Sequence, residues 1–268
     1  RGEDGRILLA APIDEATLRT LGTVTSEQQV HWDVDRRDVR AVQVERVGSL
    51  VLTERPIQPE PDLATRALLE GIRRHGLDLL RWSERARSIR TRSALLHRHL
   101  GDPWPDVADE QLLETLEVWL GPYLGKARRT ADLQKVDVTT ALSGLVGWDR
   151  VRNLDSLAPS HFEVPSGSRV RLDYSDPGGL PVLAVKLQEM FGADRSPTIA
   201  DGRIPVVVHL LSPAGRPLQI TADLDGFWDG AYAEVRKEMR GRYPKHPWPE
   251  DPRSAKPTKR TKHSQSRE

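Results

Sequence analysis

Hydrophobic and polar positions follow a mainly β pattern over residues 6–55, and at 41–45 they alternate with the period of a half-buried β-strand. Val42 and Val44 are separated by Gln43 and followed by Glu45. The polar residues 35–37 come before this run and predict a hairpin turn. Further strands are predicted at 7–11, 29–34 and 50–53, and a short helix at 14–21. Residues 1–57 are therefore expected to form part of a small β-barrel.

A linker with three prolines, at 56–61, ends the β pattern, and the hydrophobic period then becomes helical. Asp62 is a candidate N-cap for a helix that ends near Gly76. Ser83 is a candidate N-cap for a second helix, which Gly101 ends. Further helices are predicted at 112–120, 137–146 and 148–157. The pattern thus predicts a helical section over 58–157.

Alternation returns after Pro159 and predicts a second β-containing domain over 158–252. The predicted elements are strands at 170–174, 182–185, 206–211 and 218–221, and a final helix at 226–240. Residues 253–268 carry six basic residues against Glu268 alone and no large apolar side chain. We therefore expect a disordered basic tail at 253–268.

The composition narrows the possible chemistry. The chain has 268 residues and no cysteine, which excludes disulfides, thiolate zinc sites and cysteine nucleophiles and suits the reducing cytoplasm. Its 40 basic and 39 acidic residues produce no overall basic field, so any contact with nucleic acid must come from local patches. No apolar run approaches the ~20 residues that span a bilayer, so no membrane contact is expected. The first residue is Arg1, and we expect the chain to begin inside a domain.

Several motifs for catalysis or metal binding can be tested and set aside. A phosphate-binding loop needs a Gly-Lys-Ser/Thr ending, whereas the segment from Gly121 to Lys126 is one residue too short and is followed by Ala127. Asp33, Asp35 and Asp38 lack the glycine and the distal glutamate of a calcium loop, and a solvated turn explains them better. We expect no metal site and no catalytic residue in this chain.

Clusters of basic residues are the candidate binding sites. Arginines surround the apolar stripe of the helix that follows Ser83, and two more share one face of a predicted strand. Such faces neutralise phosphates, although solvated faces carry the same pattern. Cations also mix with aromatic rings near the end of the last predicted helix, which suits single-stranded nucleic acid. The candidate nucleic-acid-binding residues are Arg85, Arg92, Arg169, Arg171, Arg236, Arg240, Arg242 and Lys245.

The aromatic residues of this last cluster have a second explanation. Tyr243 and Trp248 stand among prolines that restrict the backbone to extended conformations. Aromatic side chains presented in this way often anchor a segment on a core. We expect both rings to pack on the terminal domain, with Arg242 and Lys245 pointing outward.

Several segments, taken in order, resemble a known family. They are WD…VGSLVLTERPI (32–57), VPSGSRVRLDY (164–174), LAVKLQEMFG (183–192), HLLSPAGRPLQIT (209–221) and RGRYPKHPWPEDP (240–252). The last four segments resemble the C-terminal region of the HrpB family, the bacterial DEAH-type ATP-dependent helicases. Residues 32–57 and the helical section resemble the segment between that family's motor and its terminal domain. The resemblance covers residues 1–252 and leaves the basic tail outside it.

The resemblance implies an α+β fold, with the end of an OB-like β-barrel at 1–57, a helical section at 58–157 and a terminal mixed α+β domain at 158–252. ATP and Mg²⁺ would be bound by the motor domains of the parent helicase, and no cofactor by this chain. The implied partners are single-stranded RNA or DNA, with RNA favoured, and the helicase core of the same polypeptide.

The implied role is an accessory one in strand binding and motor packing. Two alternatives remain: a structural or protein-docking module without direct nucleic-acid contact, and a standalone enzyme of unknown reaction.

The 268-residue chain alone is expected to hydrolyse no ATP, with or without RNA, because its sequence contains no phosphate loop and no acidic motif paired with one. A steady-state ATPase assay on the purified chain checks this. RNA-stimulated turnover that disappears in Lys126→Ala would contradict it.

Overall fold

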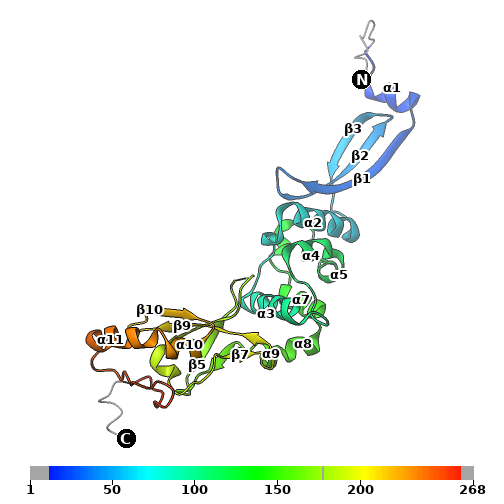
Figure 1. Cartoon of the computed structure of the whole chain (residues 1–268). Helices are drawn as coiled ribbons and strands as arrows, with labels where there is room; N and C mark the ends of the chain where they lie inside the picture. The colour runs from blue at the N-terminus through cyan, green and yellow to red at the C-terminus, as the bar shows by residue number, and fades with distance from the viewer. Residues whose placement is uncertain (1–11, 177, 261–268) are drawn as a thin grey trace, which may run out of the picture. The chain divides into compact units, whose positions relative to one another are not determined.

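The computed structural model describes residues 12–176 and 178–260, which divide into two compact units (Figure 1). Unit 1 joins the described residues up to 81 to 109–138, and unit 2 joins 82–108 to the described residues from 139 onward. Each unit contains helices and a β-sheet, so the expected α+β class is confirmed. The helical section expected at 58–157 is divided between the two units.

Unit 1 starts with a short helix and a three-stranded sheet. Helix α1 (Glu15–Leu21) begins after Asp14, whose Oδ1 accepts a hydrogen bond from the Thr17 N–H at 2.7 Å. The strands β1 (Val24–Asp33), β2 (Asp38–Val47) and β3 (Leu50–Pro56) are antiparallel, in the order β1-β2-β3.

The expected OB-like barrel is not found in the described part of unit 1. Both turns join neighbouring strands, and β1 does not pair with β3, so the sheet stays open. The strand predicted at 7–11 lies outside the described residues.

Helix α2 (Pro61–His75) packs against this sheet through Trp32, which is 4% exposed. The Trp32 ring lies directly over Gly71 of α2, where a Cβ would meet ring carbons at 2.3 Å. The helix begins earlier than predicted. Pro61 takes the first helical position and Glu60 the N-cap, while Asp62 lies in the first turn. Proline suits that position because its missing N–H would be unpaired there in any case.

The returning segment of unit 1 is built from short helices. They are α4 (Asp109–Glu114), α5 (Leu116–Trp119), the 3₁₀ turn η2 (Gly121–Tyr123) and α6 (Thr130–Leu133), and a further 3₁₀ turn, η1 (Leu77–Leu79), follows α2. The single helix predicted at 112–120 is therefore interrupted at Thr115. Trp119 lies over the break, 2% exposed, and its Nε1 donates to the Leu112 carbonyl at 2.9 Å.

Unit 2 begins with α3 (Glu84–Leu100), whose predicted cap is confirmed. The Ser83 hydroxyl accepts a hydrogen bond from the Ala86 N–H at 3.0 Å, and Gly101 follows the last turn with φ of +67°. The helices α7 (Val138–Val146), α8 (Trp148–Arg152) and α9 (Leu154–Leu157) cover the predicted ranges 137–146 and 148–157.

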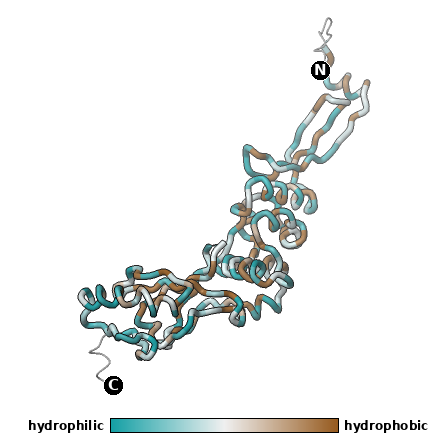
Figure 2. The backbone as a smooth tube through the Cα atoms, viewed as in Figure 1, coloured by the Kyte–Doolittle hydropathy of each residue, from teal (hydrophilic) through white to brown (hydrophobic). Residues whose placement is uncertain are grey.

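A five-stranded sheet forms the centre of unit 2, in the order β10-β9-β6-β5-β4. Its strands β6 and β9 are parallel and the other neighbours antiparallel. Figure 2 shows hydrophobic stretches along these strands. The strands are β4 (His161–Glu163), β5 (Arg169–Asp173), β6 (Val182–Lys186), β9 (Val207–Leu211) and β10 (Pro217–Thr221).

The remaining elements of unit 2 are η3 (Leu187–Met190), the small ladder β7 (Thr198–Ile199) and β8 (Ile204–Pro205), α10 (Leu224–Asp229) and α11 (Tyr232–Arg242). The single helix predicted at 226–240 is thus two helices. Phe227, Trp228 and Tyr232 sit at their junction and pack against one another with ring centroids 5.0–6.1 Å apart. Trp228 also donates from Nε1 to the Ala193 carbonyl at 2.9 Å.

The start of the expected basic tail is docked on unit 2. Arg253 donates to the carboxylates of Asp229 at 2.7 Å and Asp225 at 2.6 Å, and its guanidinium holds the pKa of the Asp229 carboxyl below its usual range. Thr258 is 7% exposed, and its N–H donates to the Gln188 carbonyl at 3.0 Å. The prediction of disorder is therefore wrong for 253–260, because polar contacts hold a segment without large apolar side chains. Residues 261–268 lie outside the described part.

Gly71→Ala is expected to destabilise unit 1. Alanine favours a helix by up to about 1 kcal/mol over glycine, but overlap with the buried Trp32 ring costs about 1–3 kcal/mol. The matched control is Gly241→Ala in α11, where an added Cβ meets nothing within 4 Å, and it should be neutral or stabilising. Urea unfolding of both variants measures the difference. Equal or higher stability of Gly71→Ala would contradict the packing described here.

Candidate nucleic-acid interface

A groove of about 600 Å³ in unit 1 brings four arginines together. Arg36 and Arg40 come from the β1–β2 turn and strand β2, and Arg128 and Arg129 from the loop before α6. Glu54 of β3 is the one acidic residue of the lining. The other lining residues are Val39, Ala41, Val42, Pro56, Ile57, Gln58 and Pro59.

The groove arginines are only partly neutralised. Arg40 pairs with Glu54 at 2.8 Å, with 40% and 44% of the two side chains exposed. Arg36 is 76% exposed and lies 3.8 Å from the Asp33 carboxylate. Contacts between such exposed charges are weak in water. The groove therefore keeps a positive excess that suits an anionic ligand.

The loop that carries Arg128 and Arg129 forms one wall of the groove, here called the loop wall, and hydrogen bonds within the loop and to Asp132 hold its backbone. The Asp132 Oδ2 accepts from the N–H groups of Arg128 at 3.0 Å and Arg129 at 3.2 Å. The Arg128 bond foremost, then the Lys135 side chain and the Arg129 bond, lower the pKa of the Asp132 carboxyl. The Arg128 guanidinium donates to two carbonyls of its own loop, those of Gly125 and Ala127. Arg129 is exposed to solvent.

Sequence patterns alone do not predict the groove. Its only local signals are the adjacent arginine pairs 36–37 and 128–129, and pairs of this kind are common on solvated surfaces. Their convergence depends on how residues 109–138 return to the first sheet. No periodicity within either segment carries that information.

The candidate residues on α3 separate into an exposed and a buried one. Arg85 is exposed, as expected. Arg92 is 9% exposed, and its Nη1 pairs with Asp155 and donates to the Ala158 carbonyl at 3.0 Å. Arg92 thus links α3 to the end of α9 and is removed from the candidate interface. The physical reason is that the apolar stripe of α3 is wide enough to cover position 92.

Arg169 and Arg171 are exposed on one face of β5, as their spacing predicted. Arg171 lies 3.1 Å from Glu84, the residue before Arg85. Arg169 stands opposite Glu163 in the ladder. Acids therefore lie beside this patch, and its positive excess is smaller than that of the groove.

The cluster at the end of α11 also divides. Arg236 is structural, because its Nε donates to the Trp248 carbonyl at 3.0 Å and its Nη2 to Glu250 at 2.8 Å. Arg240, Arg242 and Lys245 are exposed. The structure does not bring these three together with the β5 arginines in one described cavity.

The anchor expected in this segment is confirmed for Trp248. Its side chain is 6% exposed, and its Nε1 donates to the Tyr243 carbonyl at 3.0 Å. Tyr243 is half-buried, while Arg242 and Lys245 point into solvent as predicted.

The segment from Gly121 to Lys126 has no phosphate-loop geometry. It forms the 3₁₀ turn η2 and a tight turn that buries Leu124 and Ala127 in unit 1. The residues present therefore do not fit a nucleotide. In the described ranges, no three His, Asp or Glu side chains gather as metal ligands. Asp33 and Asp38 instead accept hydrogen bonds from backbone N–H groups of the hairpin turn and of β2.

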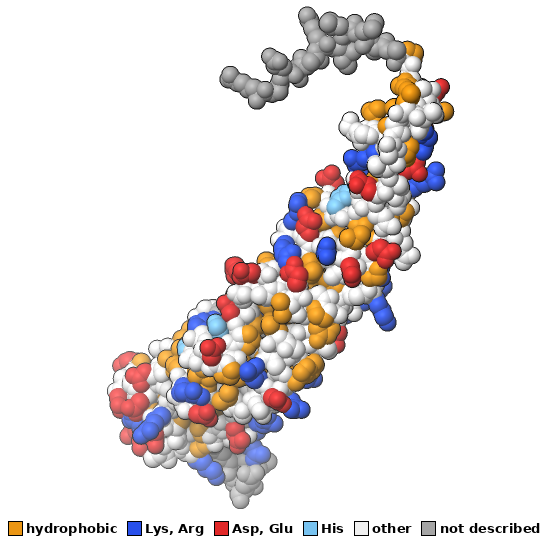
Figure 3. All heavy atoms as spheres, turned by 90° about the vertical axis from the view of Figure 1, so that its right-hand side faces the viewer, with side chains coloured by type: hydrophobic (Ala, Val, Ile, Leu, Met, Phe, Trp, Pro, Cys, Tyr) orange, Lys and Arg blue, Asp and Glu red, His pale blue; other side chains and the backbone are white. Residues whose placement is uncertain are grey.

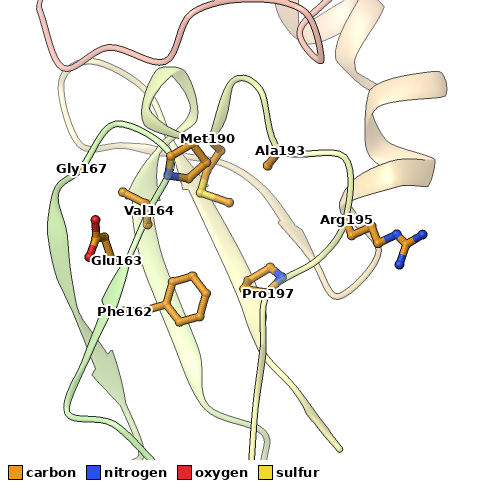
Figure 4. A pocket seen from close by; sticks show the side chains of 9 residues that line it. Phe162, Glu163, Val164, Gly167, Met190, Ala193, Arg195 and Pro197 are labelled. Carbon is orange, nitrogen blue, oxygen red and sulfur yellow. The ribbon is translucent and has the colours of Figure 1, made fainter. Parts of the chain in front are cut away.

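A second hollow, of about 450 Å³, lies in unit 2 and is mainly apolar. Figure 4 shows Phe162, Val164 and Met190 around it, while the Arg195 guanidinium points away. The complete lining is Phe162, Glu163, Val164, Pro165, Gly167, Met190, Ala193, Arg195 and Pro197. Its chemistry differs from that of the arginine groove and suits an apolar group.

Positive and negative side chains are mixed over the surface. Figure 3 shows Lys and Arg interspersed with Asp and Glu on the face it presents. This agrees with the balanced composition and leaves local hollows, rather than a broad field, to select an anion. Within the ranges that the structure describes, no helix has the length and apolar character to cross a bilayer.

Comparison with known proteins identifies similar chains. The model of the ATP-dependent helicase C-terminal family, HrpB_C, matches residues 119–252. The ATP-dependent RNA helicase HrpB of Escherichia coli (strain K12) is 45% identical over 263 residues, which is 97% of this chain and 32% of that protein. The chain therefore spans about a third of the length of this curated relative.

Two crystal structures are similar to the chain. The E. coli DExH-box NTPase HrpB has a TM-score of 0.72 and 44% identity, over 94% of this chain and 31% of that one. The E. coli DEAH/RHA helicase HrpB has a TM-score of 0.62 and 43% identity, over 84% of this chain and 29% of that one.

Trp248→Ala is expected to destabilise unit 2 by about 3–5 kcal/mol, because it empties a buried indole site and removes one of the two hydrogen bonds that the Tyr243 carbonyl accepts, the other coming from the His246 N–H. The matched control is Trp148→Ala, since Trp148 is 54% exposed and should cost little. Thermal melting of both variants is the measurement. Should Trp248→Ala melt like the wild type while losing affinity for single-stranded nucleic acid, the ring would be a binding surface and not an anchor.

Proposed function

Because the chain belongs to the HrpB_C family, the C-terminal family of ATP-dependent helicases, we propose that it is an accessory region that binds the nucleic-acid strand and packs on the helicase core of the same polypeptide. The observation that carries strand binding is the groove in unit 1, with four arginines and one glutamate. The name of the E. coli relative, an RNA helicase, favours RNA over DNA as the strand.

The physical basis is the release of counterions. A phosphodiester strand carries a condensed layer of cations, and each protein cation that replaces one contributes a favourable, salt-dependent term. Four arginines around one hollow can meet several successive phosphates, whereas isolated surface arginines meet one each. Apolar lining residues such as Ile57 and Pro59 offer contact to sugars without competing for the phosphates.

The proposed role involves no chemistry in this chain. The family implies ATP and Mg²⁺ in the parent helicase, but the segment from Gly121 to Lys126 folds as a buried turn and is no candidate to hold them. We therefore assign binding of nucleotide and metal to the part of the parent protein outside this chain. The proposed contribution of the chain is affinity for the nucleic-acid strand.

The apolar hollow of unit 2 favours a second role beside the first. Phe162, Val164 and Met190 form a concave surface that suits an apolar side chain of another protein segment (Figure 4). Unit 2 would then be a docking module, for which the helicase core is the partner that the family supplies. In this division of labour, unit 1 touches the strand and unit 2 need not.

The test of strand binding is the double variant Arg128→Gln/Arg129→Gln. A labelled single-stranded RNA of about 12 nucleotides is titrated at several salt concentrations, with anisotropy as the readout. For single strands, log K falls with log salt by about 0.7 for each phosphate contacted. The variant should bind more weakly, with a slope shallower by about 1.4, because two cations are removed.

The control for this test is Arg74→Gln. Arg74 lies on α2, outside the groove lining, and pairs with Glu70 at 2.8 Å on an exposed helix face. It removes a unit-1 charge in the same way and should leave the slope unchanged. Equal slopes for the double variant and the wild type would remove the groove from the strand-binding role.

A further inference from the structure

The two walls of the arginine groove come from segments about ninety residues apart, and one junction joins them. The Thr130 N–H donates to Asp38 Oδ1 at 2.8 Å, and the Thr130 hydroxyl donates to the Arg37 carbonyl at 2.7 Å. Thr130 directly follows Arg129 on the loop wall. The β1–β2 turn and the start of β2 form the opposite wall, here called the hairpin wall, and on it Arg37 and Asp38 lie between Arg36 and Arg40. The junction is therefore placed among the four groove arginines.

The hairpin wall is shaped to receive Thr130. Arg37 has a left-handed backbone with φ of +50°, an uncommon conformation for a residue with a Cβ. Asp38 Oδ1 accepts from its neighbour Val39 at 2.8 Å as well as from Thr130, so one carboxylate oxygen holds both the start of β2 and the incoming loop. The Asp38 carboxylate thus accepts hydrogen bonds from two backbone N–H groups. Among the described contacts it forms none with the side chains of the four groove arginines.

Like charges oppose this arrangement. Four guanidinium groups around one hollow repel one another, and Glu54, Asp33 near Arg36 and the Asp38 carboxylate between the two segments offset part of that repulsion. Two sets of hydrogen bonds hold the backbone of the loop wall. Asp132 accepts from the N–H groups of Arg128 and Arg129. Asp38 and the Arg37 carbonyl accept from Thr130. Because backbone groups make the attachment, the Arg36 and Arg129 side chains stay exposed. Arg40 pairs with Glu54, and the Arg128 guanidinium donates to carbonyls of its own loop.

We propose that Asp38 and Thr130 are positioning residues that assemble the two walls into one site for at least two neighbouring phosphates of a single nucleic-acid strand. This inference rests on the proposed function, since the strand is the same ligand. Thr130 touches no phosphate in this scheme. Its hydroxyl sets the separation of the arginine pairs, so that hairpin and loop engage the same stretch of backbone.

The test is Thr130→Val, which removes no charge. It keeps the side-chain volume and the backbone N–H but deletes the hydroxyl that holds the Arg37 carbonyl. Using the anisotropy titration with the same labelled single-stranded RNA, we expect weaker binding and a salt slope shallower by about 0.7–1.4, as if one or two cations had been removed. Thr130→Ser keeps the hydroxyl and should restore the wild-type slope.

The matched control is Thr115→Val. The Thr115 hydroxyl donates to the Gln111 carbonyl at 2.7 Å, a hydroxyl-to-carbonyl bond of the same length in the same unit, but local in the chain and outside the groove lining. Thr115→Val should lower the melting temperature by less than Thr130→Val, because the Gln111 carbonyl keeps the Thr115 N–H as a donor, and only Thr130→Val should change the slope. A merely structural role for Thr130 would move the melting temperature alone. If Thr130→Val does not fold, Thr130→Ala, which adds no bulk, is measured in its place.

The outcomes separate this inference from the proposed function. A shallower slope for Arg128→Gln/Arg129→Gln with a wild-type slope for Thr130→Val overturns the positioning role and leaves strand binding in place. Wild-type slopes for both variants overturn the strand-binding role of the groove, and the positioning role with it. A poly-glutamate peptide of equal length that binds the wild-type chain more tightly than the RNA overturns the choice of a nucleic-acid ligand.

Discussion

The groove of unit 1 depends on two carboxylates that accept hydrogen bonds from backbone N–H groups and not from arginine side chains. Asp132 holds the N–H groups of Arg128 and Arg129, and Asp38 holds those of Val39 and Thr130. Had these carboxylates paired with the arginine side chains, the loop would still be attached, but its charges would be neutralised. Because the two carboxylates bind backbone N–H groups, they leave the guanidinium groups of Arg36 and Arg129 exposed. Arg40 is paired with Glu54, and Arg128 donates to carbonyls of its own loop.

Unit 2 uses its charged residues in the opposite way. Arg92, Arg236 and Arg253 each bind a carboxylate together with at least one backbone carbonyl, and each ties two segments together. A guanidinium suits this role because its planar set of donors serves several acceptors at once. These arginines support the fold, so a count of arginines overstates the cations that unit 2 offers to a ligand.

The aromatic residues of unit 2 explain why the C-terminal segment stays attached. The Tyr232 hydroxyl donates to the Pro249 carbonyl at 2.8 Å, and the buried Trp248 donates from Nε1 to the Tyr243 carbonyl at 3.0 Å. An aromatic side chain with a polar edge can join an irregular segment to a core, since the ring removes apolar surface from water while its O–H or N–H donates to a backbone carbonyl. The same residues hold the chain that leads to Arg253 and Thr258, where sequence alone predicted disorder.

Local patterns in the sequence determined most of the helices and strands, because capping, alternation and chain breaks act over a few residues. The sequence correctly predicted that Ser83 caps the start of α3 and that Gly101 ends it. It also correctly predicted that the two arginines of β5 share one exposed face. The family was also readable, since its segments are long and occur in order. Tertiary structure alone decided which arginines are buried, as for Arg92, and which converge, as for Arg36 and Arg129. Convergence depends on how residues 109–138 return to the first sheet, and such long-range pairing leaves no period in either segment.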